Sequence, residues 1–232
     1  MPLDIAVIGG NTGIGLATVG QLARAGHRVH LAARNPGEAA SHAASVRPFD
    51  AASPAGLVWP ERLDGLAYFP GTIALKPFHR MTDDDFRRDL QVNFFGAVEA
   101  LRSALPALKA SGSASVVLFS TVAVVQGMPM HAGIAAAKGA LEGLARSLAA
   151  EWAPAVRVNV VAPGLTDTPL AAPLLNAEAK REAAAKRHPL QRVGTAEQTA
   201  ALAAWLLGPE SVFMTGQVLR PDGGLSAVRT FA

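Results

Sequence analysis

Short runs rich in apolar residues alternate along the chain with longer stretches in which apolar residues recur every three or four positions. The short runs are typical of buried strands, and the periodic stretches are typical of helices. Residues 14–25 have the helical period, and Gly26 follows them in the position of a C-terminal cap. The runs predict seven strands, at residues 4–8, 27–33, 45–50, 64–69, 113–120, 156–162 and within 215–224.

Two long helices are expected between these strands. The first begins at Thr82, where "TDDDF" supplies a capping side chain and first-turn acids, and runs toward Leu108. The second, rich in Ala and Leu, covers about residues 129–152. Strands that alternate with helices pair in parallel through right-handed crossovers. We therefore predict one doubly wound α/β domain over residues 1–232, with a parallel sheet flanked by helices.

Two segments depart from this alternation. Between Asp50 and Leu63 the chain is short and carries two prolines, so the crossover helix expected there is stunted or missing. Residues 165–195 look like an inserted helical segment, and we expect them to form a lid over the substrate.

Composition excludes several classes of function. The net charge of +3, without a Lys/Arg cluster, argues against nucleic acid as a partner. The chain has no cysteine, which excludes disulfides, thiolate catalysis and zinc thiolate sites, and we expect no metal site. The uncharged stretch 110–137 is broken by Gly112, Gly127 and Pro129, so we expect no membrane span. The N-terminus does not resemble a signal peptide, and the sequence predicts a soluble, cytoplasmic protein.

A glycine-rich turn, "VIGGNTGIG" (7–15), follows the first strand and opens the first helix. Gly9 permits a tight turn, Gly13 lets the backbone approach a pyrophosphate, and Gly15 allows close helix packing. The amides at the helix N-terminus would then face the anion. The turn predicts a dinucleotide site, although glycine-rich turns without a ligand also occur.

The end of the second strand indicates which dinucleotide binds. A site for NAD has a carboxylate there, which binds the ribose 2′-hydroxyl. This strand ends in Ala33, and Arg34 follows, which leaves room and a positive charge for a 2′-phosphate. NADP(H) is therefore favoured, the alternative being that Arg34 is a solvated surface residue. Asp50, which ends the third strand, is placed to contact the adenine or serves only as a turn residue.

Seven motifs together resemble the short-chain dehydrogenase/reductase family, in its compact form like the 3-oxoacyl-carrier-protein reductases. They are "GGNTGIG" (9–15), "QVNFFGA" (91–97), "LFSTVA" (118–123), "GIAAAKGAL" (133–141), "VRVNVVAPGLTDTPL" (156–170), "HPLQRVGTAEQTA" (188–200) and "FMTGQVLRPDGG" (213–224). The likeness covers nearly the whole chain. It implies a Rossmann-type sheet, a nicotinamide cofactor, a small-molecule substrate, and a homodimer or homotetramer.

The resemblance also implies a set of cofactor contacts. In this family the matching lysine binds the nicotinamide ribose, the matching asparagine holds a water in the proton relay, and the loop after the sixth strand contacts the carboxamide and pyrophosphate. Carried over to this chain, the cofactor-binding residues are Gly9, Asn11, Thr12, Gly13, Ile14, Gly15, Arg34, Asp50, Gly71, Asn93, Lys138, Pro163, Gly164, Thr166 and Thr168.

The catalytic set of the family carries over only in part. Asn93 and Lys138 match it, and Thr121 stands where a serine usually polarises the substrate carbonyl, with Ser120 beside it as a weaker candidate. Ile134 occupies the place of the catalytic tyrosine, one helical turn before Lys138. His131 lies on the same helix face as Ile134 and could act as an acid near neutral pH, or merely line the substrate site.

A second departure is "YFPG" (68–71), where the family usually has Asn-Asn-Ala-Gly. Tyr68, the single tyrosine of the chain, and Phe69 must therefore repack the floor of the site.

Three functions remain open. The first is an NADP(H)-dependent oxidoreductase for a small carbonyl or hydroxyl substrate, with a non-standard proton route. The second is a reductase of a C=C or C=N bond, in which solvent or the charge of the substrate completes the reaction. The third is a non-catalytic NADP-binding protein with a regulatory or structural role. Asn93 and Lys138 favour the first two, and Ile134 favours the third.

Overall fold

The computed structural model describes residues 1–54 and 56–230. Within this part of the chain, seven strands form one parallel sheet in the order β3-β2-β1-β4-β5-β6-β9, and β7 and β8 form a small separate pair. The strands are β1 (Asp4–Ile8), β2 (Arg28–Ala32), β3 (Ser45–Arg47), β4 (Gly65–Tyr68), β5 (Ala114–Phe119), β6 (Val156–Val161), β7 (Thr166–Asp167), β8 (Gly194–Thr195) and β9 (Val218–Leu219). The predicted doubly wound α/β fold is confirmed.

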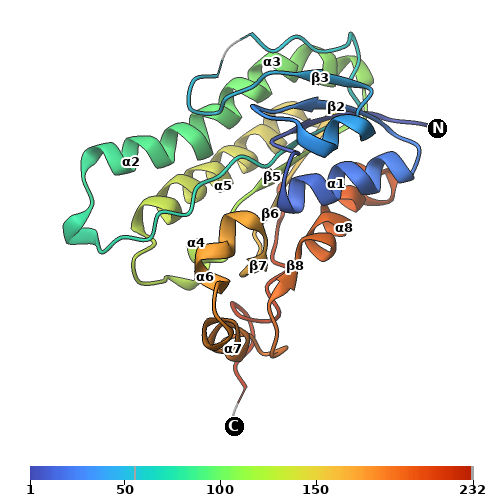
Figure 1. Cartoon of the computed structure of the whole chain (residues 1–232). Helices are drawn as coiled ribbons and strands as arrows, with labels where there is room; N and C mark the ends of the chain where they lie inside the picture. The colour runs from blue at the N-terminus through green and yellow to red at the C-terminus, as the bar shows by residue number, and fades with distance from the viewer. Residues whose placement is uncertain (55, 231–232) are drawn as a thin grey trace.

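Helices cover both faces of the sheet (Figure 1). The α-helices are α1 (Gly13–Arg24), α2 (Asp83–Leu90), α3 (Gly96–Ser111), α4 (Ala123–Gln126), α5 (Ala132–Trp152), α6 (Ala172–Leu175), α7 (Glu178–Lys186) and α8 (Ala196–Leu207). Short 3₁₀ turns cover Gly37–His42, Phe78–Arg80, Pro169–Ala171 and Pro209–Ser211, and Gln91–Phe95 is π-helical.

The central strand shows how the sheet is buried. Side chains alternate along β1, so Ile5 and Val7 pack in the apolar cluster under α1 and α8. Ala6 and Ile8 point the other way, into the cluster under α3 and α5. None of the four is exposed, which explains why the strand is an uninterrupted apolar run.

The strand order places a crevice at one edge of the sheet. From β1 the chain moves outward through β2 and β3, then returns to the other side of β1 to form β4 and β5. The connections that leave β1 and β4 therefore diverge to opposite sides. In doubly wound sheets, ligands bind outside the carboxyl ends of the strands at this switch point.

The helix predicted from Thr82 to Leu108 is continuous but changes its geometry. Thr82 and Asp85 form the expected capping box at its start. Between α2 and α3, residues 91–95 form a π-helical turn, and the helix ends at Ser111, followed by Gly112 with φ +73°. Single π turns inside α-helices occur frequently at functional sites.

Other boundaries also differ from the predicted ones. The helix expected from about residue 129 begins at Ala132, and the short helix α4 precedes it. Of the strand predicted within 215–224 only β9 forms, and α8 was not predicted. The described residues between Asp50 and Leu63 contain no helix, as expected.

Residues 165–195 are folded as a small unit at one end of the molecule (Figure 1). They contain β7, α6, α7 and β8, and three buried residues, Ala171, Leu175 and Ala184, form an apolar cluster of their own. None of the described helices is long and apolar enough to cross a membrane.

Candidate functional site

A cavity of about 980 Å³ opens at the carboxyl ends of β1, β2 and β4, at the switch point of the sheet. Its wall includes the glycine-rich turn after β1, residues 33–35 after β2, residues 49–52 after β3 and residues 69–72 after β4. Residues 168–170 close it from the side of the small unit. The cavity is large enough for a small-molecule ligand and lies where the fold predicts a ligand site.

The backbone of the glycine-rich turn depends on its glycines. Gly9 has a φ of +74°, and a Cβ there would lie 2.8 Å from Cδ of Pro70. A Cβ on Gly15 would lie 2.7 Å from the carbonyl oxygen of Gly9, so only glycine lets α1 pack this closely on the turn. Gly13 has a φ of +52°, and a Cβ there would lie 3.1 Å from Cβ of Thr168.

The start of α1 is open for an anion. Thr12 is the N-cap residue, yet its side chain makes no capping hydrogen bond, so its hydroxyl is not used by the helix. Thr12, Asn11 and Ile14 all line the cavity. Backbone amides and the helix dipole favour a phosphate at such a terminus. The turn therefore fits the pyrophosphate of a dinucleotide.

The far end of the cavity contains Arg34 and Asp50. Arg34 is exposed and has no carboxylate partner among the described residues, while Ala33 beside it is buried. Asp50 is half-buried and accepts a hydrogen bond of 2.9 Å from the backbone amide of Ala52, so it serves as a turn residue while lining the cavity.

Lys138 lies directly behind the cavity wall. A Cβ on the cavity-lining residue Gly71 would lie 3.6 Å from Nζ of Lys138 and 3.3 Å from Oδ1 of Asn93. Lys138 is only 5% exposed and forms no ion pair with any described residue. Burial therefore lowers the pKa of Lys138 to about 7.

Asn93 belongs to a buried polar cluster with Thr72 and Asp89. Nδ2 of Asn93 donates to Oγ1 of Thr72 at 2.9 Å and to the backbone oxygen of Asp89 at 2.8 Å. Oγ1 of Thr72 donates to Oδ1 of Asp89 at 2.7 Å. Asp89 and Asn93 are fully buried, whereas Thr72 lines the cavity.

Comparison with known proteins agrees with this fold. A family model described as enoyl-(acyl carrier protein) reductase matches residues 8–226. A tropinone reductase homologue of Arabidopsis thaliana is 34% identical over 243 residues, which cover 97% of this chain and 93% of the homologue.

Solved structures give the same result. The ligand-free aldohexose dehydrogenase of Thermoplasma acidophilum superposes with a TM-score of 0.88 at 26% identity, covering 100% of this chain and 96% of that one. A complex of Pseudomonas aeruginosa RhlG with NADP has a TM-score of 0.86 at 28% identity, covering 97% and 96%.

The chain belongs to the short-chain dehydrogenase/reductase family. It is thus an oxidoreductase-family protein of the kind that uses a nicotinamide cofactor and small-molecule substrates.

The residue at the tyrosine position of a short-chain dehydrogenase/reductase is buried here. Ile134 is 6% exposed and lies in the first turn of α5, four residues before Lys138. An aliphatic side chain has no proton to exchange. Tyr68 does not replace it: its side chain is fully buried, burial raises its pKa, and its hydroxyl donates to the backbone oxygen of Val92 at 2.6 Å.

The other catalytic candidates lie in different surroundings. The Ser120 hydroxyl donates to Oε1 of Glu142 at 2.7 Å, and both residues are buried. Thr121 is half-buried, and its hydroxyl oxygen accepts a hydrogen bond of 3.3 Å from the amide of Ala123. His131 is the N-cap residue of α5, and its Nδ1 bonds the backbone oxygen of Pro129 at 2.7 Å, so its ring turns toward the preceding loop.

The loop after β6 is only partly at the cavity. Thr168 lines it, whereas Pro163, Gly164 and Thr166 do not. A Cβ on Gly164 would lie 3.0 Å from Cα of Asp222, so this glycine is required where two backbone segments meet.

Sequence reasoning missed Thr72, Asp89 and Glu142. Asp89 lies four residues before Asn93, and Glu142 lies four residues after Lys138. Each carboxylate therefore shares a helix face with a predicted site residue, and this spacing was the available signal. Phe69 lies against Phe119 at a centroid distance of 4.5 Å, and both rings line the cavity.

Proposed function

We propose that this protein is an NADP(H)-dependent oxidoreductase that acts on a small carbonyl or hydroxyl substrate, or on a C=C or C=N bond. Its proton route does not use a tyrosine. The observation that carries the proposal is the cavity itself: its glycine-rich end fits a pyrophosphate, and its far end presents Arg34 without a carboxylate partner among the described residues. Among the similar structures, one is described as an NADP complex.

Different residues would bind different parts of the cofactor. The turn at residues 9–15 would hold the pyrophosphate, Arg34 a 2′-phosphate, and Asp50 the adenine end. Lys138, behind Gly71, would bind the ribose next to the nicotinamide. Reduced nicotinamide supplies a hydride when it is bound. Thr121 would hold the oxygen of the substrate, and residues 165–195, which contribute Thr168 to the cavity wall, would cover it.

A second function is favoured by one observation. Ile134 is buried, apolar and unable to exchange a proton, as expected of a non-catalytic NADP-binding protein. Turnover separates the two functions. We expect slow NADPH-dependent reduction of at least one of three probes: ethyl pyruvate as an activated ketone, cyclohexenone as a conjugated C=C bond, and methylpyrroline as an imine. NADPH binding without turnover of any probe would favour the non-catalytic function.

Cofactor choice is tested by titration with NADPH and NADH. We expect tighter binding of NADPH, and Arg34→Ala should remove most of the difference because it removes the charge facing the 2′-phosphate. Arg24→Ala is the matched control, since Arg24 is exposed at the other end of α1, roughly 16 Å along the helix. Equal affinities in the parent protein would contradict the proposed NADP preference.

We also propose a homodimer or homotetramer. Apolar side chains that are largely exposed in the single chain, among them Phe95, Val212 and Phe213, support this. Sedimentation should give at least twice the mass of one 23.9 kDa chain, and the mass of a single chain at micromolar concentration would contradict it.

A further inference from the structure

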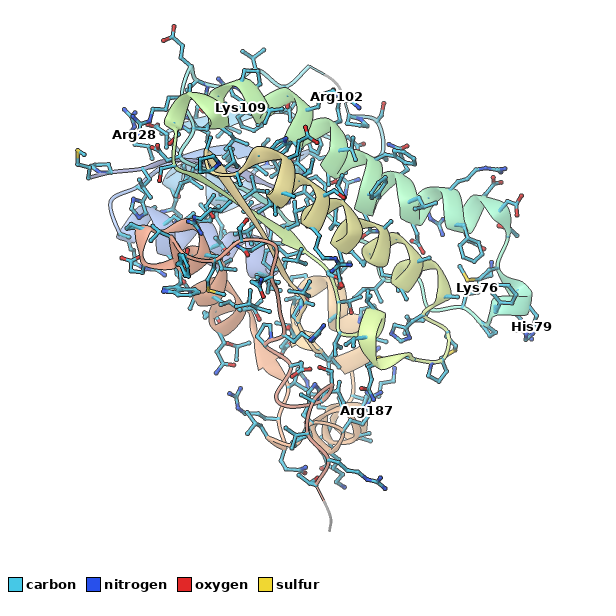
Figure 2. All side chains as sticks on the ribbon, turned by 180° about the vertical axis from the view of Figure 1, so that it is seen from behind. Arg28, Lys76, His79, Arg102, Lys109 and Arg187 are labelled. Carbon is cyan, nitrogen blue, oxygen red and sulfur yellow. The ribbon has the colours of Figure 1, made fainter. Side chains whose placement is uncertain are left out.

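The cluster of Asp89, Thr72 and Asn93 places a buried carboxyl group beside the site that Ile134 leaves without a proton donor. Asp89 lies on α2, which packs against α5, and the two helices run side by side (Figures 1 and 2). A Cβ on Gly133 would lie 2.5 Å from Oδ2 of Asp89. The carboxyl group therefore lies against the backbone of α5 at the residue immediately before Ile134.

The hydrogen bonds of Asp89 leave one of its two carboxyl oxygens without a partner among the described residues. Its Oδ1 accepts from Thr72, but its Oδ2 is buried and has no hydrogen-bond partner in the described part of the chain. Asp89 is fully buried and forms no ion pair with a described cation. A buried carboxyl group without full compensation costs several kcal/mol, so an apolar residue would make this packing more stable. Such a costly group is expected where it has a function.

Thr72 connects this carboxyl group to the cavity. Its hydroxyl donates to Asp89 and accepts from Asn93, and a second lone pair remains on the oxygen. The residue lines the cavity next to Gly71, and Nζ of Lys138 lies behind Gly71. The hydroxyl can therefore contact a ligand in the cavity while it stays bonded to Asp89.

We propose that Thr72 and Asp89 are the proton route of this site, with Thr72 touching the substrate and Asp89 exchanging the proton through it. This inference rests on the proposed oxidoreductase function. In oxidation, the substrate hydroxyl would give its proton to Oγ1 of Thr72 and the Thr72 proton would move to Asp89, while bound NADP⁺ would supply the hydride acceptor. In reduction, each transfer is reversed, and Asp89 regains its proton from water.

Three variants and one control test the route by their activity. Asp89→Asn keeps the shape and the acceptor for Thr72 but cannot relay a proton, and Thr72→Val removes the hydroxyl at nearly constant volume. We expect each to lower kcat for the probe that the parent reduces by at least about 100-fold, as for loss of a general acid, with KM and NADPH affinity unchanged. Thr72→Ser, which keeps the hydroxyl, should retain activity. Asp84→Asn, also on α2 but with an 89% exposed side chain, is the matched control.

Two further readouts separate a proton route from a structural role. Formate has the size of the lost carboxyl group, so it should restore activity to Asp89→Ala but not to Thr72→Val. In the protein without cofactor, the infrared band of the Asp89 carboxyl group is the one that disappears in Asp89→Asn. This band should shift in Thr72→Val and stay in place in Thr72→Ser and Asp84→Asn.

The outcomes are distinguishable. Where the parent is active, any of three results would overturn the proton route and leave the oxidoreductase function standing. These are full activity of Asp89→Asn, no rescue of Asp89→Ala by formate, and an infrared band that does not shift in Thr72→Val. A parent that binds NADPH but reduces none of ethyl pyruvate, cyclohexenone and methylpyrroline would overturn the function and the route together.

Discussion

Replacing Lys138 by methionine should stabilise the protein without cofactor below neutral pH. Lys138 is buried, and no described carboxylate pairs with it. In the unfolded chain its pKa is near 10.5, whereas burial lowers it to about 7 in the folded protein. Below pH 7 both states carry the proton, and the folded state must hold a buried, unpaired ammonium group. Methionine has a similar length and no charge, so it removes this cost.

The size and the pH window of the effect follow from the two pKa values. Between about pH 7 and 10.5 the unfolded chain binds one more proton than the folded protein, so the contribution of Lys138 to stability rises with pH in that window. The full difference corresponds to at most roughly 5 kcal/mol. Water that reaches the amine offsets part of it, so we expect Lys138→Met to gain at least about 2 kcal/mol in unfolding free energy at about pH 6. The gain should disappear above about pH 10.5, where both states become neutral.

Urea unfolding of the parent and the variant, followed by circular dichroism at several pH values, measures this difference. Other titrating groups cancel because they are common to both proteins. Lys109→Met is the control, since Lys109 lies exposed on the outside of α3 (Figure 2) and should show no such pH dependence. A stability gap between parent and Lys138→Met that is the same at low and high pH would refute the reasoning.

Two further predictions concern the start of α5. Ile134→Tyr places a phenol one turn before Lys138, whose charge favours the phenolate, so turnover of ethyl pyruvate should rise by at least roughly tenfold. No gain in a folded, NADPH-binding variant would mean that the pocket has been remodelled. Gly133→Ala should lower the free energy of unfolding in urea by about 1–3 kcal/mol, because its Cβ would meet the Asp89 carboxyl group at 2.5 Å. Gly143→Ala on the same helix has free space and should be neutral or stabilising, and equal effects of the two variants would contradict this packing.

Much of the fold could be predicted because its signals are local. Strands buried on both faces are rich in apolar residues, and such runs mark β1 and β5 in the sequence, whereas β6 also contains Arg157 and Asn159. The capping side chain of Thr82 likewise marked the start of α2. The length of β3 was overestimated, since its pairing with β2 ends at Arg47, and no sequence window contains that information.

The π turn at residues 91–95 could not be predicted. Nothing in "QVNFF" breaks a helix, and the turn is braced by distant groups, among them the Tyr68 hydroxyl on the backbone oxygen of Val92. The glycine-rich turn could be located from the sequence because such turns have a fixed spacing, and the structure places it at the wall of the cavity. The polar cluster was not, because Thr72 and Asp89 are brought together from a loop and a helix by the packing of α2 against α5.

The site contains two buried pairs of a hydroxyl and a carboxyl group, and their surroundings assign them different roles. Ser120 donates to Glu142 at 2.7 Å, and Thr72 donates to Asp89 at the same distance. Ser120 is buried and is not part of the cavity wall, so its pair joins β5 to α5 without access to a ligand. Thr72 is at the wall, and its carboxyl partner retains a free oxygen beside α5. Of these two pairs, the one formed by Thr72 is therefore open to a ligand in the cavity, as the proposed proton route requires.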